Sequence, residues 1–104
     1  MSEKKVQYKL SPKDRAKLKG LANGISQRYL LGKSDLDDAF LNLIDKALEA
    51  KELIKVGLLQ SCEATPREVG ERLEEALGAY IVQTIGRIVI LYRPSKKDPK
   101  IHLD

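Results

Sequence analysis

The sequence is poor in cysteine, histidine and long hydrophobic runs, and each shortage excludes a class of protein. Cys62 is the only cysteine among 104 residues, so no internal disulfide forms, as suits a reducing cytosol. One cysteine and one histidine also provide no cluster for a zinc site. Aliphatic runs reach four residues, as at residues 88–91, against about 20 for a membrane span. No apolar segment follows the first five residues, so we expect no signal peptide and a cytoplasmic protein with no membrane contact.

The marks of an enzyme are also missing from the sequence. There is no glycine-rich nucleotide loop of the P-loop or dinucleotide type. No serine or cysteine motif indicates a nucleophile, and there is a single histidine. The paired carboxylates in the middle of the chain are better explained as the solvent-exposed surface of helices than as catalytic groups. We therefore predict a protein that is not an enzyme and needs neither a cofactor nor a small-molecule substrate.

What the sequence does contain is charge sorted by position. Residues 1–33 carry nine basic residues against two acids, whereas residues 34–80 carry five basic residues against eleven acids. Residues 81–104 carry five basic residues against two acids. The net charge of +4 therefore hides two basic ends around an acidic middle. If the fold brings both ends to one side, that side is a polyanion-binding surface.

Local signals predict three helices. Ser11 ahead of Pro12 marks the first, which Asn23 and Gly24 end, and a capping box at residues 65–68 begins the third. Each helix carries apolar residues at helical spacing, which predict its buried stripe. These are Leu18, Leu21 and Ala22 in the first, Phe40, Leu43, Ile44, Ala47 and Leu48 in the second, and Val69, Leu73, Ala76 and Leu77 in the third.

Strands are predicted at residues 28–31, 53–59, 80–85 and 88–92, with Gly86 and Arg87 forming a two-residue hairpin turn. Alternation of strands and helices places the first three strands in a mainly parallel sheet, to which the hairpin adds an antiparallel strand. Two amphipathic helices would cover one face. The predicted fold is a single compact α/β domain over residues 10–104, with helices packed on a mixed four-stranded sheet. Residues 1–9 are predicted to be a flexible basic segment, and residues 94–104 a mostly irregular tail.

Four stretches, in their combined order and spacing, carry a family resemblance. They are residues 10–13, which open a basic helix containing Leu21 and Ala22, residues 31–33, residues 44–56 and the hairpin at residues 82–94. Together they resemble the bacterial YhbY-like RNA-binding proteins, which are stand-alone versions of the CRM domain (chloroplast RNA splicing and ribosome maturation). The similarity covers residues 10–104.

The resemblance implies a compact α/β fold similar to the C-terminal domain of the third translation initiation factor. It also implies association with the precursor of the large ribosomal subunit in bacteria. We expect a monomer that binds ribosomal RNA there and assists assembly of the large subunit. Related domains in plant organelles assist intron splicing.

The family's RNA-contacting loop is usually Gly-x-x-Gly, between the first strand and the second helix. Here the loop is Gly32-Lys33-Ser34-Asp35, so the second glycine is missing. Glycines let a backbone approach a phosphate, and amides at a helix start attract an anion. Asp35 places a carboxylate there instead, which weakens the loop as a phosphate cradle and leaves Lys33 as its main contact.

The predicted RNA contacts combine this loop with basic residues of both ends. They are Gly32, Lys33, Ser34, Asp35, Lys13, Lys17, Arg28, Arg87 and Arg93. Each basic residue also has a simpler reading: the helix lysines as a solvated face, Arg87 as an exposed turn residue, and Arg93 beside Pro94 as protection of a sheet edge. Few aromatics are available for stacking, so we expect recognition of phosphates and RNA shape. The rival function is a protein-interaction module that docks an acidic partner, or pairs an edge strand, on the ribosome.

Overall fold

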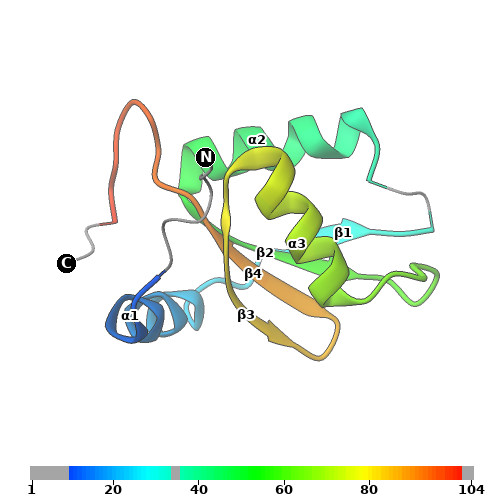
Figure 1. The fold of residues 1–104 in the computed structure, drawn as a ribbon, viewed down its shortest axis with the longest axis horizontal. Helices are drawn as coiled ribbons and strands as arrows, with labels where there is room; N and C mark the ends of the chain where they lie inside the picture. Colours follow the sequence, from blue (N-terminus) through cyan, green and yellow to red (C-terminus); the bar gives the residue numbers. More distant parts are fainter. Residues whose placement is uncertain (1–9, 34–35, 102–104) are drawn as a thin grey trace, which may run out of the picture.

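The seven predicted elements are present in the predicted order. A computed structural model describes residues 10–33 and 36–101; the expected basic segment at residues 1–9 lies outside them. Three helices and four strands form a single α/β domain (Figure 1), which confirms the predicted fold class. Their bounds are α1 Pro12–Ala22, β1 Tyr29–Leu31, α2 Asp38–Lys51, β2 Leu53–Leu58, α3 Pro66–Leu77, β3 Tyr80–Ile85 and β4 Ile88–Tyr92.

The sheet has the strand order β1-β2-β4-β3. β1 pairs with β2 in parallel, and β4 pairs antiparallel with both β2 and β3. The first three strands therefore run in one direction, as predicted, but β4 lies between β2 and β3. Because β4 lies inside the sheet, β1 and β3 are its two edge strands, and the last four residues of β4 are buried. Arg93, which follows β4, consequently does not protect a sheet edge.

The ends of the elements follow from local chemistry. The hydroxyl of Ser11 accepts a hydrogen bond from the N–H of Asp14 at 3.0 Å and caps α1. Thr65 and Glu68 form the predicted capping box at the start of α3. Gly78 ends α3 with φ 71°, and Gly86 opens the hairpin turn with φ 57°, conformations that glycine adopts without steric cost.

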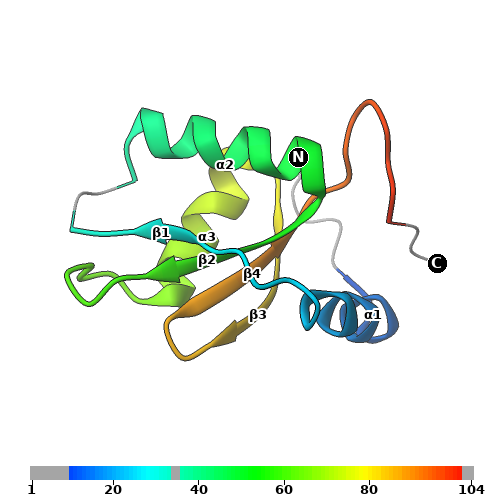
Figure 2. The same cartoon turned by 180° about the vertical axis from the view of Figure 1, so that it is seen from behind.

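The sheet separates two hydrophobic clusters. On one face, α2 and α3 cover a core that includes Ile44, Leu48, Val69 and Leu73. On the other face α1 covers a smaller cluster, whose members are Leu10, Leu18, Ala22, Leu53, Val82, Ile90 and Tyr92. Figure 1 shows α3 in front of the sheet, and Figure 2, from behind, shows the strands unobstructed by α3 with α1 at one end. Both faces of β2 are buried as a result, so its apolar and polar positions do not alternate in exposure.

Three residues of the predicted buried stripes are exposed. Leu21 and Leu43 are 45% and 48% exposed, and Ala76 is also exposed, so these assignments were wrong. The buried stripe of α2 is narrower than predicted, with Ile44, Ala47 and Leu48 inward. A single helix–sheet contact buries positions at i, i+3 and i+4, and residues at the border of that stripe face water.

The predicted irregular tail has no helix or strand, but it is firmly docked through residue 101. Glu52 ends α2 with φ 66°, and its side chain is fully buried. Its carboxylate accepts hydrogen bonds from the backbone N–H groups of Ser95, Lys100 and Ile101 at 2.7–2.8 Å. Glu49 accepts bonds from the Ser95 hydroxyl and from two further N–H groups of the segment. Two carboxylates at the end of α2 therefore hold the C-terminal segment.

The same bonds lower the pKa values of both carboxyls. For Glu52, burial opposes ionisation, but the three N–H donors and the nearby charge of Lys100 outweigh it and lower the pKa. The pKa of Glu49 is lowered chiefly by the N–H of Lys96 and the hydroxyl of Ser95. Each carboxyl is therefore a stronger acid in the folded chain than in the unfolded one.

Candidate nucleic-acid interface

The sheet divides the charges of the three helices. α1 carries four basic residues and one acid. On the opposite face, α3 carries four acids and two basic residues, and α2 carries three acids and two basic residues. None of the four strands contains an acidic residue. The α1 side of the sheet therefore presents positive charge, and the α2–α3 side is acidic.

The basic residues of α1 divide into two kinds. Lys13, Lys17 and Lys19 are exposed. Arg15 is partly buried, and its guanidinium donates hydrogen bonds to the carbonyls of Ile81 and Val82, both at 2.7 Å. Arg15 thus ties α1 to the irregular start of β3, where the register shifts between Ile81 and Gln83. It holds the exposed lysines in a fixed place beside the sheet.

The loop after β1 lies at the far end of the sheet from α1 (Figure 1). Lys33 is exposed there, and the backbone N–H of Leu59 donates to the carbonyl of Leu31 at 2.9 Å, which joins this loop to the one after β2. A Cβ added to Gly32 would make only ordinary contacts, at 3.5 Å or more, so packing does not require glycine at this position. Ser34 and Asp35 lie outside the described residues.

Asp37 has a structural task at the same loop. Its carboxylate accepts a hydrogen bond from the N–H of Phe40 at 2.9 Å and caps α2. Asp38 occupies the first turn of α2, where the helix dipole favours an acid. The anion-attracting end of α2 is thus already supplied with carboxylates, which leaves Lys33 as the cation of the described part of the loop.

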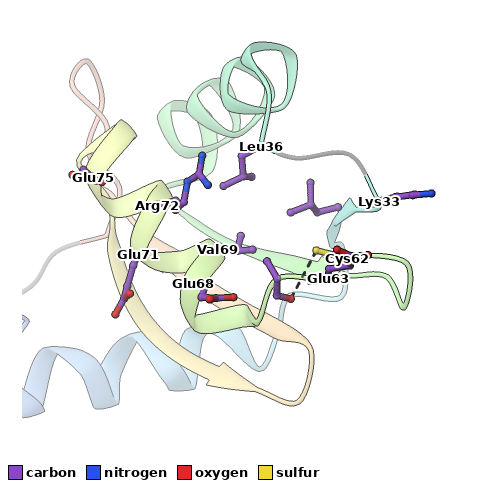
Figure 3. A pocket seen from close by; sticks show the side chains of 11 residues that line it. Lys33, Leu36, Cys62, Glu63, Glu68, Val69, Glu71, Arg72 and Glu75 are labelled. Atoms are coloured by element: carbon purple, nitrogen blue, oxygen red, sulfur yellow. Dashed lines mark hydrogen bonds between the residues drawn. The ribbon is translucent and has the colours of Figure 1, made fainter.

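A cavity of about 450 Å³ lies between the loop after β1, the loop after β2 and α3 (Figure 3). Leu31, Leu36, Cys62 and Val69 give it an apolar wall. Charged residues also line it, with acids in the majority: Lys33, Glu63, Glu68, Glu71, Arg72 and Glu75. Lys33 points away from the cavity in Figure 3. The acids make this cavity a poor site for phosphate, whereas the outward Lys33 can reach a polyanion beside it.

Arg87 lies at the same end of the sheet as Lys33, but its guanidinium is engaged by the protein. It donates hydrogen bonds to the carbonyls of Leu58, Leu59 and Cys62 at 2.8–3.2 Å. These bonds fasten the loop after β2 to the hairpin turn. The residue remains exposed, so its outer surface can still face an anion.

Arg93 is placed apart from the other candidates. Its side chain is 9% exposed, and it forms an ion pair with Asp45 of α2 at 2.7 Å. It also donates to the backbone carbonyls of Leu77 and Asp45 at 3.0 Å. Arg93 therefore joins the end of β4 to the middle of α2 and to the end of α3 on the acidic side, and the structure does not bring it to the same surface as Lys13 and Lys17.

Arg28 and Lys55 add positive charge to the α1 side of the sheet. Arg28 is exposed, and its side chain lies over Gly57, where its Cδ would be 3.7 Å from an added Cβ. Lys55 donates to the carbonyl of Ile25 at 2.7 Å and was not among the sequence candidates. Lys55 lies between Ile54 and Val56 on β2, and side chains alternate between the two faces of a strand. This alternation could have predicted that Lys55 lies on the face opposite to the one covered by α2 and α3.

The described residues offer neither a metal site nor a membrane span. Among residues 10–33 and 36–101, no group of three or more histidine, cysteine, aspartate or glutamate side chains could hold a metal ion. No helix in that part of the chain is both long and apolar enough to cross a bilayer.

Comparison with known proteins gives a consistent set of relatives. The sequence profile of the CRS1 / YhbY (CRM) domain matches residues 10–93. The Bacillus subtilis protein named "Probable RNA-binding protein YqeI" is 37% identical over 94 residues, which are 90% of this chain and 98% of that protein. A Haemophilus influenzae protein named RNA-binding protein is 38% identical over 94 residues, covering 90% of this chain and 94% of that protein. The solution structure of the hypothetical protein SAV1595 from Staphylococcus aureus superposes with a TM-score of 0.74 at 36% identity, covering 91% and 99% of the two chains.

Proposed function

This chain belongs to the CRS1 / YhbY (CRM) domain family, and from that membership we propose that it binds RNA through the α1 side of its sheet. The observation that carries this proposal is the division of charge by the sheet. An RNA backbone gains from neutralisation by lysine and arginine and is repelled by carboxylates. Of the three helices in the described residues, only α1 has more basic residues than acids, and it covers this side of the sheet.

The proposed contacts lie in two groups along this side. Lys13 and Lys17 of α1 form one group. Lys33, which follows β1, and Arg87, in the turn between β3 and β4, form the other, and Arg28 precedes β1 and lies over Gly57. Gly32, Ser34 and Asp35 complete the loop of the second group. Arg93 is left out, because its guanidinium is buried in contacts with Asp45 and Leu77. A rigid sheet then sets the spacing of the phosphates that the two groups can neutralise.

We further propose that the RNA is ribosomal and that the protein assists assembly of the large ribosomal subunit. This step rests on what the resemblance to the YhbY-like proteins implies, and the names of the relatives above, RNA-binding or probable RNA-binding protein, agree with RNA as the ligand. Sedimentation of cell lysates tests it directly. The proposal expects the protein to travel with precursors of the large subunit and cross-links to map to its RNA, and a protein found only in the free fraction would contradict it.

The rival function is a protein-interaction module that docks an acidic partner or pairs an edge strand, and its second form, strand addition, has little support from the sheet edges. β1 is three residues long, which offers few backbone groups for pairing. At the other edge, the start of β3 is occupied, because Arg15 bonds the carbonyls of Ile81 and Val82 and Glu74 accepts from the N–H of Ile81 at 2.8 Å. Neither edge is a ready template for another strand.

Binding of purified protein to ribosomal RNA, measured at several salt concentrations, separates the two functions. The RNA proposal expects affinity without any other protein, with log affinity falling linearly as log salt rises by about 0.7–0.9 per phosphate contact. Tight association that requires a partner protein would favour the rival.

A further inference from the structure

One row of side chains crosses the whole sheet at the end not covered by α1. The strand registers align Leu30 of β1 with Gly57 of β2, Gly57 with Ile88 of β4, and Ile88 with Ile85 of β3. Residues directly opposite one another in adjacent strands point to the same face of a sheet. These four positions, called the aliphatic row below, therefore lie side by side on one face.

The aliphatic row faces the α1 side but lies beyond the reach of α1. Four residues closer to the start of β2, the registers align Leu53, Tyr92 and Tyr80, and this aligned set belongs to the cluster beneath α1. In the aliphatic row, by contrast, Leu30 is 57% exposed and Ile85 is 52% exposed. Figure 2 shows this end of the sheet with no helix of the described chain in front of it. The helix thus covers one half of the face and leaves an apolar half open.

Gly57 makes the open half flat. It has no side chain, and the side chain of Leu30 fills the space above it: the Leu30 Cδ2 would lie 3.3 Å from a Cβ added at Gly57. Arg28 lies over the same glycine. The leucine thus lies across the glycine, and the two isoleucines follow on the next two strands, so the row forms a low apolar shelf with no side chain projecting from β2.

The charged side chains that the described strands and Arg28 contribute beside the aliphatic row are basic. The four strands contain no acid, and Arg28 and Lys55 share this side of the sheet. Lys33, which follows β1, and Arg87, which precedes β4, lie on one side of the row along the strand direction, and α1 with its lysines lies on the other side. A ligand that matches this pattern has flat apolar rings joined by anions, which describes the unpaired nucleotides of an RNA strand. A duplex hides its base faces, and a purely apolar protein surface gains nothing from the flanking cations.

We propose that the aliphatic row is a platform for one or two unpaired bases of the bound RNA, with the cations on either side holding the adjoining phosphates. This rests on the proposed function and adds to it a preference for single-stranded segments. Because aromatic residues are few, the sequence predicts contacts with phosphates and RNA shape alone. The proposed platform adds a base contact, since aliphatic side chains can also cover the face of a base. The exposed residues Leu30 and Ile85 supply that cover from opposite edges of the sheet.

The test compares a Leu30→Ala/Ile85→Ala variant with wild type on a fluorescent single-stranded RNA and on the same RNA paired to its complement. Loss of the platform is expected to weaken single-strand binding about 5-fold, which is the lower end of the effect of removing an aromatic side chain that stacks on a base. Duplex binding and the salt slope should stay unchanged, because no phosphate contact is removed. The matched control is Leu43→Ala, a leucine of similar exposure on α2, which should bind both RNAs as wild type does.

Methyl spectra of the wild-type protein provide a second readout that needs no variant. Stacked bases shift nearby methyl signals through their ring currents, so the Leu30, Ile85 and Ile88 methyls should move on addition of single-stranded RNA while the Leu43 methyls stay in place. Unmoved row methyls, or an equal loss for single strand and duplex in the variant, would overturn the platform. A wild-type protein that binds neither RNA would instead overturn the proposed function itself.

Discussion

The carboxylate of Glu52 accepts a hydrogen bond from the backbone N–H of Ser95 at 2.7 Å, which joins the end of α2 to a segment 43 residues further along the chain. Two more N–H donors, from Lys100 and Ile101, complete the site. A residue other than glycine with φ 66° strains the backbone. The Glu52 carboxylate offsets this cost, because it accepts hydrogen bonds from three backbone N–H groups that would otherwise lack a partner.

Glu52→Gln is expected to lower the free energy of unfolding by about 2–3 kcal/mol, because a neutral amide replaces a charged acceptor of several hydrogen bonds. Chemical denaturation at neutral pH measures this. Glu75→Gln on the exposed surface of α3 is the control and should change stability by less than about 0.5 kcal/mol. Equal stabilities of the two variants would show that the hydrogen bonds of the Glu52 carboxylate to the C-terminal segment contribute nothing to the free energy of unfolding.

The same carboxylate gives stability a defined pH dependence. The folded pKa of Glu52 is lowered, so its contribution is complete above the unfolded value of about 4.3 and is lost as pH falls through the folded pKa. Wild-type stability should therefore fall on acidification below about pH 5, and the Glu52→Gln variant should fall less. The remaining dependence comes in part from Glu49, whose pKa is lowered in the same way. Parallel curves for the two proteins would contradict this assignment.

Gly70 allows α3 to lie close to the sheet. A Cβ at this position would be 2.8 Å from the Ile81 Cδ1 and 3.0 Å from the Val89 Cγ2. Gly70→Ala is therefore expected to destabilise the fold by about 1–3 kcal/mol through overpacking. Gly20→Ala in α1 is the matched control: nothing lies within 4 Å of its added Cβ, and helix propensity predicts a gain of about 0.5–1 kcal/mol. Thermal denaturation of the two variants should shift in opposite directions.

Arg87 has a structural role that its place in a turn does not reveal. Arg87→Gln removes donors to the carbonyls of Leu58, Leu59 and Cys62, so the melting temperature should fall, with a loss of about 1–2 kcal/mol. From the sequence, an exposed turn charge suggests no change in stability. An unchanged melting temperature would mean that solvent replaces these bonds at no cost.

Lys33→Glu is expected to weaken RNA binding without unfolding the protein, because Lys33 is exposed and points away from the cavity beside it. Reversal of one charge next to phosphates should cost at least several-fold in affinity at low salt. Circular dichroism checks the fold of the variant. Wild-type affinity in the folded variant would remove Lys33 from the interface.

Local signals in the sequence were sufficient for the elements and their ends. The cap at Ser11, the stop at Asn23, and the box of Thr65 and Glu68 depend on neighbours within four residues, and all three were predicted correctly. The fold class also followed from element order and from the family resemblance.

Contacts between distant residues were not predictable in the same way. Arg93 is basic and lies beside Pro94, which suggested exposure, but it is buried because β4 inserts at the centre of the sheet and brings it to Asp45. Leu43 and Leu21 fit helical spacing and are exposed, because spacing alone does not give the width of a helix–sheet contact. The hydrogen bonds of the Glu52 carboxylate join residues 43 or more positions apart in the sequence, and no local sequence pattern predicts them.

The measurement that most directly tests RNA binding by the α1 side compares two charge variants with equal loss of charge. Lys13→Gln/Lys17→Gln alters α1, and Lys46→Gln/Lys96→Gln alters exposed lysines of α2 and of the C-terminal segment. Affinity for ribosomal RNA is measured for both over a series of salt concentrations. The account predicts that the α1 variant binds more weakly, with a salt slope smaller by about 0.7–0.9 for each lost phosphate contact, while the control keeps the wild-type slope. Equal slopes for the two variants, or a larger loss in the control, would contradict it.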